Sequence, residues 1–175
     1  MPYLTAELQS KYQFNIDVVN QLEKEFGDDY YDLEAEYNEY WNSVLMNQII
    51  HESSGGQGHL AGAGPIDYNE GKIIYFYIRL RKPRNVLEVG FASGVSSALI
   101  AKALEMNGKG KLYTGDLNSA PDHKWIITDF KYYIEKGIIV PTYPIDGVQF
   151  VEEFDKKIPI DLTFSDASHE KDFCF

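Results

Sequence analysis

The chain has 175 residues, enough for one domain with a sizeable core and too few for two. Its 27 acidic residues outnumber 16 basic ones and give a formal net charge of -11, so most of the surface would repel a nucleic-acid backbone and we expect no nucleic-acid partner. The sequence has one cysteine, no signal-peptide pattern and no apolar run near the roughly 20 residues of a spanning helix. We therefore expect a cytoplasmic protein without a membrane partner.

Residues 15–50 carry apolar side chains at a three- to four-residue spacing, which predicts one face of a helix. We interpret this face as a packing face, with the acids between its residues on a solvated side. Because tyrosine suits both cores and interfaces, a homo-oligomer contact is the alternative. The positions of this face are Tyr30, Leu33, Tyr37, Tyr40, Val44 and Leu45.

The stretch SSGGQGHLAGAGP, residues 53–65, is rich in glycine and has no apolar period, which predicts a loop. Residues 1–65 are therefore interpreted as an N-terminal helical extension with a Gly-rich loop. The loop is not a P-loop, because no Gly-Lys-Ser/Thr follows it and no strand precedes it. A plain linker is the favoured interpretation, and a substrate loop with Gln57 and His59 as polar contacts is the alternative.

From Asp67 onward, segments typical of helices and strands alternate regularly. Strands separated by helices of this length imply crossover connections and a mostly parallel sheet, so the predicted class is α/β, Rossmann-like, with helices on both faces. The expected helices are residues 68–82, 96–108, 123–137 and 147–157, and the expected strands are residues 85–90, 111–116, 138–146 and 160–166.

The first predicted strand ends in a turn that contains Gly90 and Gly94. In open α/β sheets, ligands lie beyond the carboxyl ends of the strands, so this turn is the expected binding site. A dinucleotide turn of the form G-x-G-x-x-G would need glycine where Ala92 and Val95 stand. What remains is E-x-G-x-x-x-G, starting at Glu88, which is less typical of a pyrophosphate cradle.

The stretch LEVGFASGVSS, residues 87–97, resembles the first motif of class I S-adenosylmethionine-dependent methyltransferases. The likeness is greatest to small-molecule O-methyltransferases related to the catechol, caffeoyl-CoA and sugar enzymes. It continues through NEGKIIYFYIRLRKPRN, residues 69–85, and IDLTFSDASH, residues 160–169. The resemblance implies strand order 3-2-1-4, an S-adenosylmethionine cofactor and a small-molecule acceptor, with residues 66–175 as a partial cofactor-binding methyltransferase domain.

The same resemblance implies contacts with the methionine end of the cofactor. The backbone at Gly90, Ala92 and Gly94 would lie along the methionine part. Ser96 would hydrogen-bond its carboxylate, and Glu88 would meet its ammonium group. A cap or a surface acid is the alternative for Glu88.

Nucleoside contacts are implied at the ends of the next two strands. Asp116 would accept the ribose hydroxyls, with Leu117 against the adenine, although a dinucleotide enzyme would use the same acid. Asp146 and Gly147 would contact the adenine edge. A helix N-cap at Asp146 is an equally good interpretation.

The fourth predicted strand delivers Asp166 and, three residues later, His169. Metal-dependent O-methyltransferases have D-x-x-K at the corresponding place, so the resemblance implies Asp166 and His169 as the catalytic pair. A histidine with a pKa near 6.5 can act as a general base at neutral pH. Asp166 is also a candidate ligand for a divalent metal such as Mg²⁺, but one carboxylate does not make a magnesium site. A surface histidine is the alternative for His169.

The sequence ends at Phe175 before a fifth strand, which would leave the fourth strand as an edge. We therefore expect a C-terminally incomplete methyltransferase that need not be active alone. The predicted function is S-adenosylmethionine-dependent methyl transfer to a hydroxyl of a small molecule or sugar. One alternative is a nicotinamide-dependent oxidoreductase, which Ala92 and Val95 disfavour. Another is a non-catalytic binding or oligomerisation module built on the Tyr-rich N-terminal helices.

Overall fold

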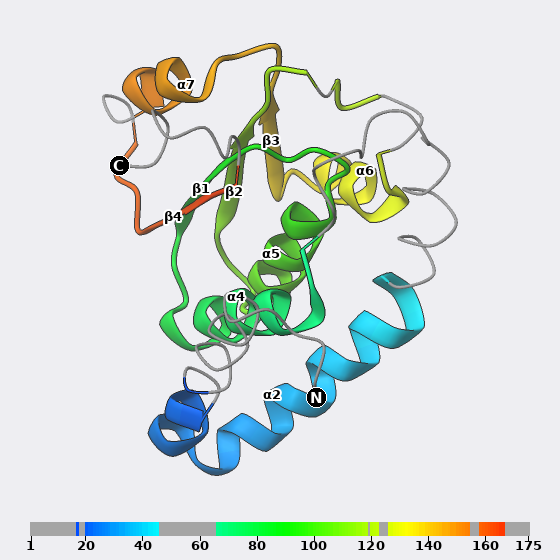
Figure 1. The fold of residues 1–175 in the computed structure, drawn as a ribbon, viewed down its shortest axis with the longest axis vertical. Coiled ribbons are helices and arrows are strands. Elements are labelled where there is room, and N and C mark those ends of the chain that lie inside the picture. Colours follow the sequence, from blue (N-terminus) through cyan, green and yellow to red (C-terminus); the bar gives the residue numbers. More distant parts are fainter. Residues whose placement is uncertain are drawn as a thin grey trace, which may run out of the picture.

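A four-stranded parallel sheet forms the centre of the protein (Figure 1). The predicted α/β class, parallel pairing and strand order are confirmed. The computed structural model describes residues 17, 20–45, 66–118, 120–122, 126–154 and 158–166. The strands are β1 (Asn85–Val89), β2 (Lys111–Gly115), β3 (Ile139–Thr142) and β4 (Leu162–Ser165), in the order β3-β2-β1-β4.

Helices alternate with these strands as the sequence predicts. No helix in the described ranges is both long and apolar enough to cross a membrane. Residues 20–26 are helical and precede the labelled elements. The helices are α2 (Asp28–Tyr40), a π-helical turn η1 (Trp41–Leu45), α4 (Tyr68–Arg81), α5 (Val95–Met106), α6 (Thr128–Glu135) and α7 (Gly147–Phe154).

Local sequence explains where α4 begins. Asp67 is its N-cap, and the Asp67 carboxylate accepts the N–H groups of Asn69 at 2.8 Å and Glu70 at 2.9 Å. The Glu70 carboxylate in turn accepts the Asp67 N–H, which completes a capping box. The helix ends at Arg81, shortly before β1 begins at Asn85. The cap therefore fixes the start of the helix that leads to the first strand.

One predicted helix begins later than expected. The sequence pattern predicts a helix over residues 123–137, but α6 begins at Thr128. Ile126 and Ile127 are buried and non-helical, and the Ile127 N–H donates to the Ser93 carbonyl at 3.0 Å. These two isoleucines therefore fill the core in front of the helix and attach it to the turn after β1.

The two faces of the sheet are covered differently. Alternate residues of a strand point to opposite faces, so Val86 belongs to the core under α4, α5 and α6, whereas Leu87 and Val89 pack with Phe150 of α7. On the first face, α5 contacts β2 and α4, and α2 packs outside α4 (Figure 1). The site described below lies where the first strand leaves this two-faced core.

The predicted packing face of the N-terminal region is confirmed. Four of its residues in α2 are buried in the same core as α4 and α5: Tyr30, Leu33, Tyr37 and Tyr40. Leu45 of η1 is buried as well, whereas the side chain of Val44 lies outside the described part of the chain. The aromatic face of α2 is thus directed at the interior of its own chain.

Candidate cofactor site

The turn between β1 and α5 has the left-handed backbone expected of a tight binding turn. Gly90 has φ 90°, Ala92 φ 43° and Gly94 φ 87°, a region that glycine adopts without steric cost. The turn is closed by the Gly94 N–H, which donates to the Phe91 carbonyl at 2.6 Å. Gly94 has a second reason to be glycine, because a Cβ there would lie 2.7 Å from the Phe130 ring.

Hydrogen bonds that continue the sheet bring three predicted site residues to one edge. The Gly90 N–H donates to the last carbonyl of β2 at 2.7 Å, and the Asp116 N–H to the last carbonyl of β3 at 3.2 Å. The Asp166 N–H donates to the last carbonyl of β1 at 3.0 Å. Because neighbouring strands lie about 4.8 Å apart, Asp116 and Asp166 flank Gly90 one strand away on each side.

The Asp116 side chain holds the turn in place. Its Oδ2 accepts the N–H groups of Phe91 at 3.1 Å and Ala92 at 3.0 Å, and its Oδ1 accepts the Asn118 N–H at 2.8 Å. Leu117 follows it with 53% of its surface exposed. An acid and an exposed apolar side chain therefore stand side by side at the end of β2; their contacts with a ribose and an adenine stay predictions.

Glu88 lies beneath the turn, on the face of the sheet that α5 covers. Its exposed fraction is 0%, and it pairs in register with Thr114 of β2. Its carboxylate accepts hydroxyl hydrogens from Ser96 at 2.6 Å, from Thr114 at 2.7 Å and from Ser97. The surface-acid interpretation of Glu88 is therefore wrong, because the side chain is sealed between two strands and a helix.

The Glu88 carboxyl is an acid in a solvent-excluded environment. Burial raises the pKa of the Glu88 carboxyl above its ordinary value, and the nearby Asp166 carboxylate acts in the same direction. The three hydroxyl hydrogen bonds oppose this, because they stabilise the ionised form. Among the described residues, hydroxyl groups and not cations thus contact the Glu88 carboxylate.

Asp146 stands at the start of α7. Its Oδ1 accepts the N–H groups of Val148 at 2.9 Å and Gln149 at 3.3 Å, which are the contacts of a helix cap. The Ile145 N–H donates to the Asp116 carbonyl at 3.0 Å, so the loop before α7 lies against the end of β2. The adenine contacts of Asp146 and Gly147 stay predictions.

The predicted catalytic pair is described only in part. Asp166 is exposed at the end of β4. His169 lies outside the described residues, as do His59 and Gln57 of the predicted substrate loop. Among the residues that the structure describes, no group of three His, Cys, Asp or Glu side chains could hold a metal ion. The residues that the structure describes therefore do not supply the ligands of a metal site.

Two residues of this site were not predicted. Ser97 and Thr114 hold Glu88 together with Ser96. The Ser96-Ser97 pair is visible in the sequence, but Ser97 is fully buried where Ser96 is half-buried. Thr114 gives no local signal, because its approach to Glu88 depends on the register between β1 and β2.

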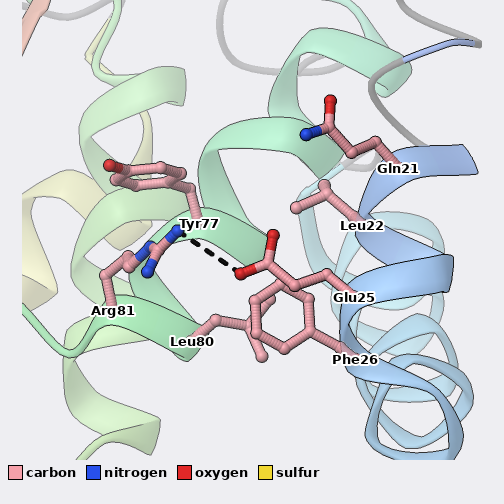
Figure 2. Close-up of a pocket in the computed structure, with 7 residues that line it drawn as sticks. All are labelled: Gln21, Leu22, Glu25, Phe26, Tyr77, Leu80 and Arg81. Atoms are coloured by element: carbon pink, nitrogen blue, oxygen red, sulfur yellow. Dashed lines mark hydrogen bonds and ion pairs between the residues drawn. The ribbon is translucent and has the colours of Figure 1, made fainter.

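A pocket at the opposite end of β1 is separate from this site (Figure 2). It has a volume of about 180 Å³ and lies between helical residues 20–26 and the last turns of α4. The pocket lies at the end of α4 that precedes the amino end of β1, whereas the turn follows the carboxyl end of β1. An ion pair from Arg81 Nη2 to Glu25 Oε1, 3.4 Å long, crosses it. The lining residues are Gln21, Leu22, Glu25, Phe26, Tyr77, Leu80 and Arg81.

The α/β fold, with its sheet order β3-β2-β1-β4, is similar to that of solved O-methyltransferases. An O-methyltransferase from Bacillus cereus in complex with SAH is 17% identical, with TM-score 0.55 over 77% of this chain and 63% of that one. TomG from Streptomyces achromogenes, an O-methyltransferase of tomaymycin synthesis in complex with SAM, is 20% identical, with TM-score 0.52 over 74% of this chain and 62% of that one.

A third similar structure is cofactor-bound Rv0187 from MTB, 17% identical, with TM-score 0.55 over 78% of this chain and 60% of that one. At these identities the likeness concerns the fold. Neither a protein-family model nor a curated protein matches the chain. The chain spans about three fifths of the length of these three solved structures.

Proposed function

We propose that this chain binds S-adenosylmethionine at the turn after β1 and forms part of an enzyme that transfers its methyl group to a hydroxyl of a small molecule or sugar. The observation that carries the proposal is the left-handed turn of Gly90, Ala92 and Gly94, held by Asp116 at the carboxyl edge of the sheet. The cofactor complexes among the similar structures support the same cofactor.

The charge of the site suits this cofactor. S-adenosylmethionine carries a sulfonium and an ammonium group, and acidic side chains attract both. Glu88, Asp116 and Asp166 come from three neighbouring strands and lie around one turn. In the proposed complex, the backbone of Gly90 and Gly94 lies along the methionine part. Asp116 accepts the ribose hydroxyls.

The adenine would lie on the far side of Asp116. Leu117 offers an exposed apolar surface there, and Ile145, which precedes Asp146 and the first residue of α7, Gly147, lies against the end of β2. Because Asp146 already caps α7, its carboxylate is held in a fixed place by the Val148 N–H. A fixed acceptor beside an apolar surface is what a base edge requires.

Methyl transfer is an in-line displacement at the sulfonium methyl, so the protein has to orient the two reactants and remove a hydroxyl proton. In the proposal, Asp166 lies on the acceptor side of the cofactor and His169 is the general base.

Calorimetric titration of the chain with S-adenosylhomocysteine and with NAD tests the cofactor. We expect S-adenosylhomocysteine to bind and NAD to show no heat. Gly90→Val should abolish binding, because a branched side chain at φ 90° distorts the turn. Gly108→Val is the matched control, since Gly108 also has positive φ, at 66°, but a Cβ there meets nothing within 4 Å and it lies beyond the far end of α5. Binding of NAD alone would contradict the proposal.

A further inference from the structure

Helix α6 packs directly against the turn after β1. The Phe130 ring of α6 lies 2.7 Å from the place of a Cβ on Gly94, and it stacks on the Phe91 ring with 5.0 Å between the centroids. The residue before the helix, Ile127, donates its N–H to the Ser93 carbonyl at 3.0 Å. Three residues of the turn therefore depend on where α6 begins.

Little within α6 itself fixes this position. The helix has eight residues, and among the described residues no side chain caps its start at Ile127. Helices this short are marginal without tertiary contacts, because the first turn has to be ordered before its hydrogen bonds are gained. The contacts of α6 with neighbouring elements therefore decide where the Phe130 ring lies.

The first turn of α6 is bound to α2 by a hydrogen bond between side chains. The hydroxyl of Tyr40, the last residue of α2, donates to Asp129 Oδ2 at 2.5 Å. Tyr40 is only 6% exposed. Burial and the Asp129 carboxylate raise the pKa of the Tyr40 hydroxyl, so it stays protonated as a donor. Because Asp129 directly precedes Phe130, this charge-assisted bond acts on the part of α6 that contacts the turn.

The α2 end of this connection is itself held in place. The Tyr37 hydroxyl of α2 donates to the carbonyl of Tyr68, the first residue of α4, at 2.7 Å. Helix α4 packs in turn against α5, which begins directly after the turn. A closed series of contacts thus runs from the turn through α5, α4, α2 and α6 back to the turn. In that series, Tyr40 and Asp129 connect α2 to α6.

We infer that Tyr40 and Asp129 are positioning residues: their hydrogen bond holds the first turn of α6, and through Phe130 it keeps the turn after β1 in its binding conformation. The N-terminal helix α2 thereby contributes to cofactor affinity through α6. The effect on affinity rests on the proposed binding of S-adenosylmethionine, whereas the effect on the turn does not.

The experiment compares Tyr40→Phe with Tyr37→Phe. Both substitutions remove one hydroxyl from a buried tyrosine of α2 and keep the ring, but the first breaks a bond to α6 and the second a bond to α4. Calorimetry with S-adenosylhomocysteine should show binding weakened about fivefold in Tyr40→Phe and unchanged in Tyr37→Phe. Urea denaturation should show that both variants fold and lose similar amounts of stability.

Hydrogen exchange measured by NMR gives a readout that needs no ligand. The N–H groups of Gly94 and Ile127 report on the turn and on its contact with α6, because both are hydrogen-bonded there. We expect both to exchange about tenfold faster in Tyr40→Phe, as for the loss of a hydrogen bond to a charged group. The Ile145 N–H is the control, since it bonds the end of β2 and its side chain packs with the α7 face of the sheet. It should exchange at the wild-type rate.

Two substitutions of Asp129 test the same hydrogen bond from its acceptor side. Asp129→Asn keeps an acceptor oxygen for the Tyr40 hydroxyl and should bind S-adenosylhomocysteine nearly as the wild type does, whereas Asp129→Ala should match Tyr40→Phe. In the double variant the two losses should not add, because both substitutions remove one bond. Asp129→Ala also replaces Tyr40→Phe in the comparison if that variant does not fold.

Two results would overturn the inference. One is wild-type exchange at Gly94 in a folded Tyr40→Phe variant, because the hydrogen bond would then not hold the turn. The other is an equal loss of affinity in Tyr37→Phe, which would assign the effect to the packing of α2 in general. If the wild-type chain binds no S-adenosylhomocysteine, the proposed function fails, and exchange at Gly94 alone decides whether Tyr40 positions the turn.

Discussion

Charged side chains are buried or partly buried in two regions of this protein, and their partners differ between the two. At the interface of α2 and α4, Lys72 pairs with Glu34, and Arg79 Nε lies 2.7 Å from Glu36 Oε1. Beneath the turn after β1, Glu88 is contacted by hydroxyls. In the first region, acidic and basic side chains neutralise one another, whereas the second region holds a negative charge beneath a backbone turn.

If the proposed function holds, this difference separates a structural use of charge from a functional one. Opposite charges in contact compensate the cost of removing both from water, so the pairs of α2 and α4 fix one helix against the other. Hydroxyls compensate this cost only in part, which the upward shift of the Glu88 pKa reflects. A charge held at such a cost fits the proposed binding of S-adenosylmethionine, which carries cationic groups.

The largest effect is expected at the turn itself. Gly94→Ala places a Cβ 2.7 Å from the Phe130 ring at a residue with φ +87°. Backbone strain and overpacking together should lower the free energy of unfolding by about 3 kcal/mol. Urea denaturation measures the loss.

Gly108→Ala is the matched control for that substitution. Gly108 has φ +66°, but a Cβ there meets nothing within 4 Å, so only the backbone strain of about 1 kcal/mol applies. Equal losses in the two variants would mean that Phe130 does not constrain the turn. A side chain at Gly94 would then cost no more stability than one at an ordinary helix end.

A smaller effect is expected at the interface of α2 and α4. Arg79→Met removes the cation from Glu36, and the two side chains are only 17% and 21% exposed. We expect a loss of about 2 kcal/mol in the free energy of unfolding, because the remaining carboxylate is left without its charge partner. The double variant Arg79→Met/Glu36→Gln should recover part of the loss.

Arg81→Met serves as the control, because Arg81 and its partner Glu25 are 57% and 44% exposed. Solvent-exposed pairs contribute about 0–1 kcal/mol. A loss as large as that of Arg79→Met would show that burial does not distinguish the two pairs. Charge cancellation would then not be what holds α2 to α4.

Periodicity and turn chemistry were sufficient to predict the layers of this protein. The alternation of apolar segments gave the parallel sheet, and the spacing of Tyr30, Leu33 and Tyr37 gave the buried face of α2. The start of α6 was missed because Ile126 and Ile127 are apolar at helical spacing yet lie in the core outside the helix. A periodic pattern reports burial and does not by itself report the backbone conformation.

The candidate site was predictable in its position and less so in its contacts. Gly90, Asp116 and Asp166 follow strand ends, and parallel pairing alone brings them to one edge. The environment of Glu88 was not predictable, because Thr114 meets it through the register of two strands separated by a helix. The sequence likewise left two roles for Asp146, and the structure shows the contacts of only one, the helix cap.

The smallest expected effect is on the pH dependence of stability, to which two carboxyls contribute with opposite sign. Burial raises the pKa of Glu88 above its ordinary 4.5. Above that pH the folded state therefore binds more protons than the unfolded state. Stability falls as the pH rises through the raised pKa. For Glu105, burial also favours a higher pKa, but the hydrogen bond from Lys136 and the charge of Lys102 lower it below 4.5. Its contribution is therefore present above the ordinary pKa and is lost as the pH falls through the lowered one.

Each variant isolates one of these contributions. Stability measured by urea denaturation between pH 3 and 8 should show the wild-type advantage over Glu88→Gln shrinking as the pH rises above about 4.5, and the advantage over Glu105→Gln shrinking as the pH falls below about 4.5. Slopes of the same sign would mean that the hydroxyls around Glu88 stabilise its charge as fully as a lysine does. In that case the buried charge beneath the turn would carry no cost, and its placement would no longer distinguish a ligand site from a structural pair.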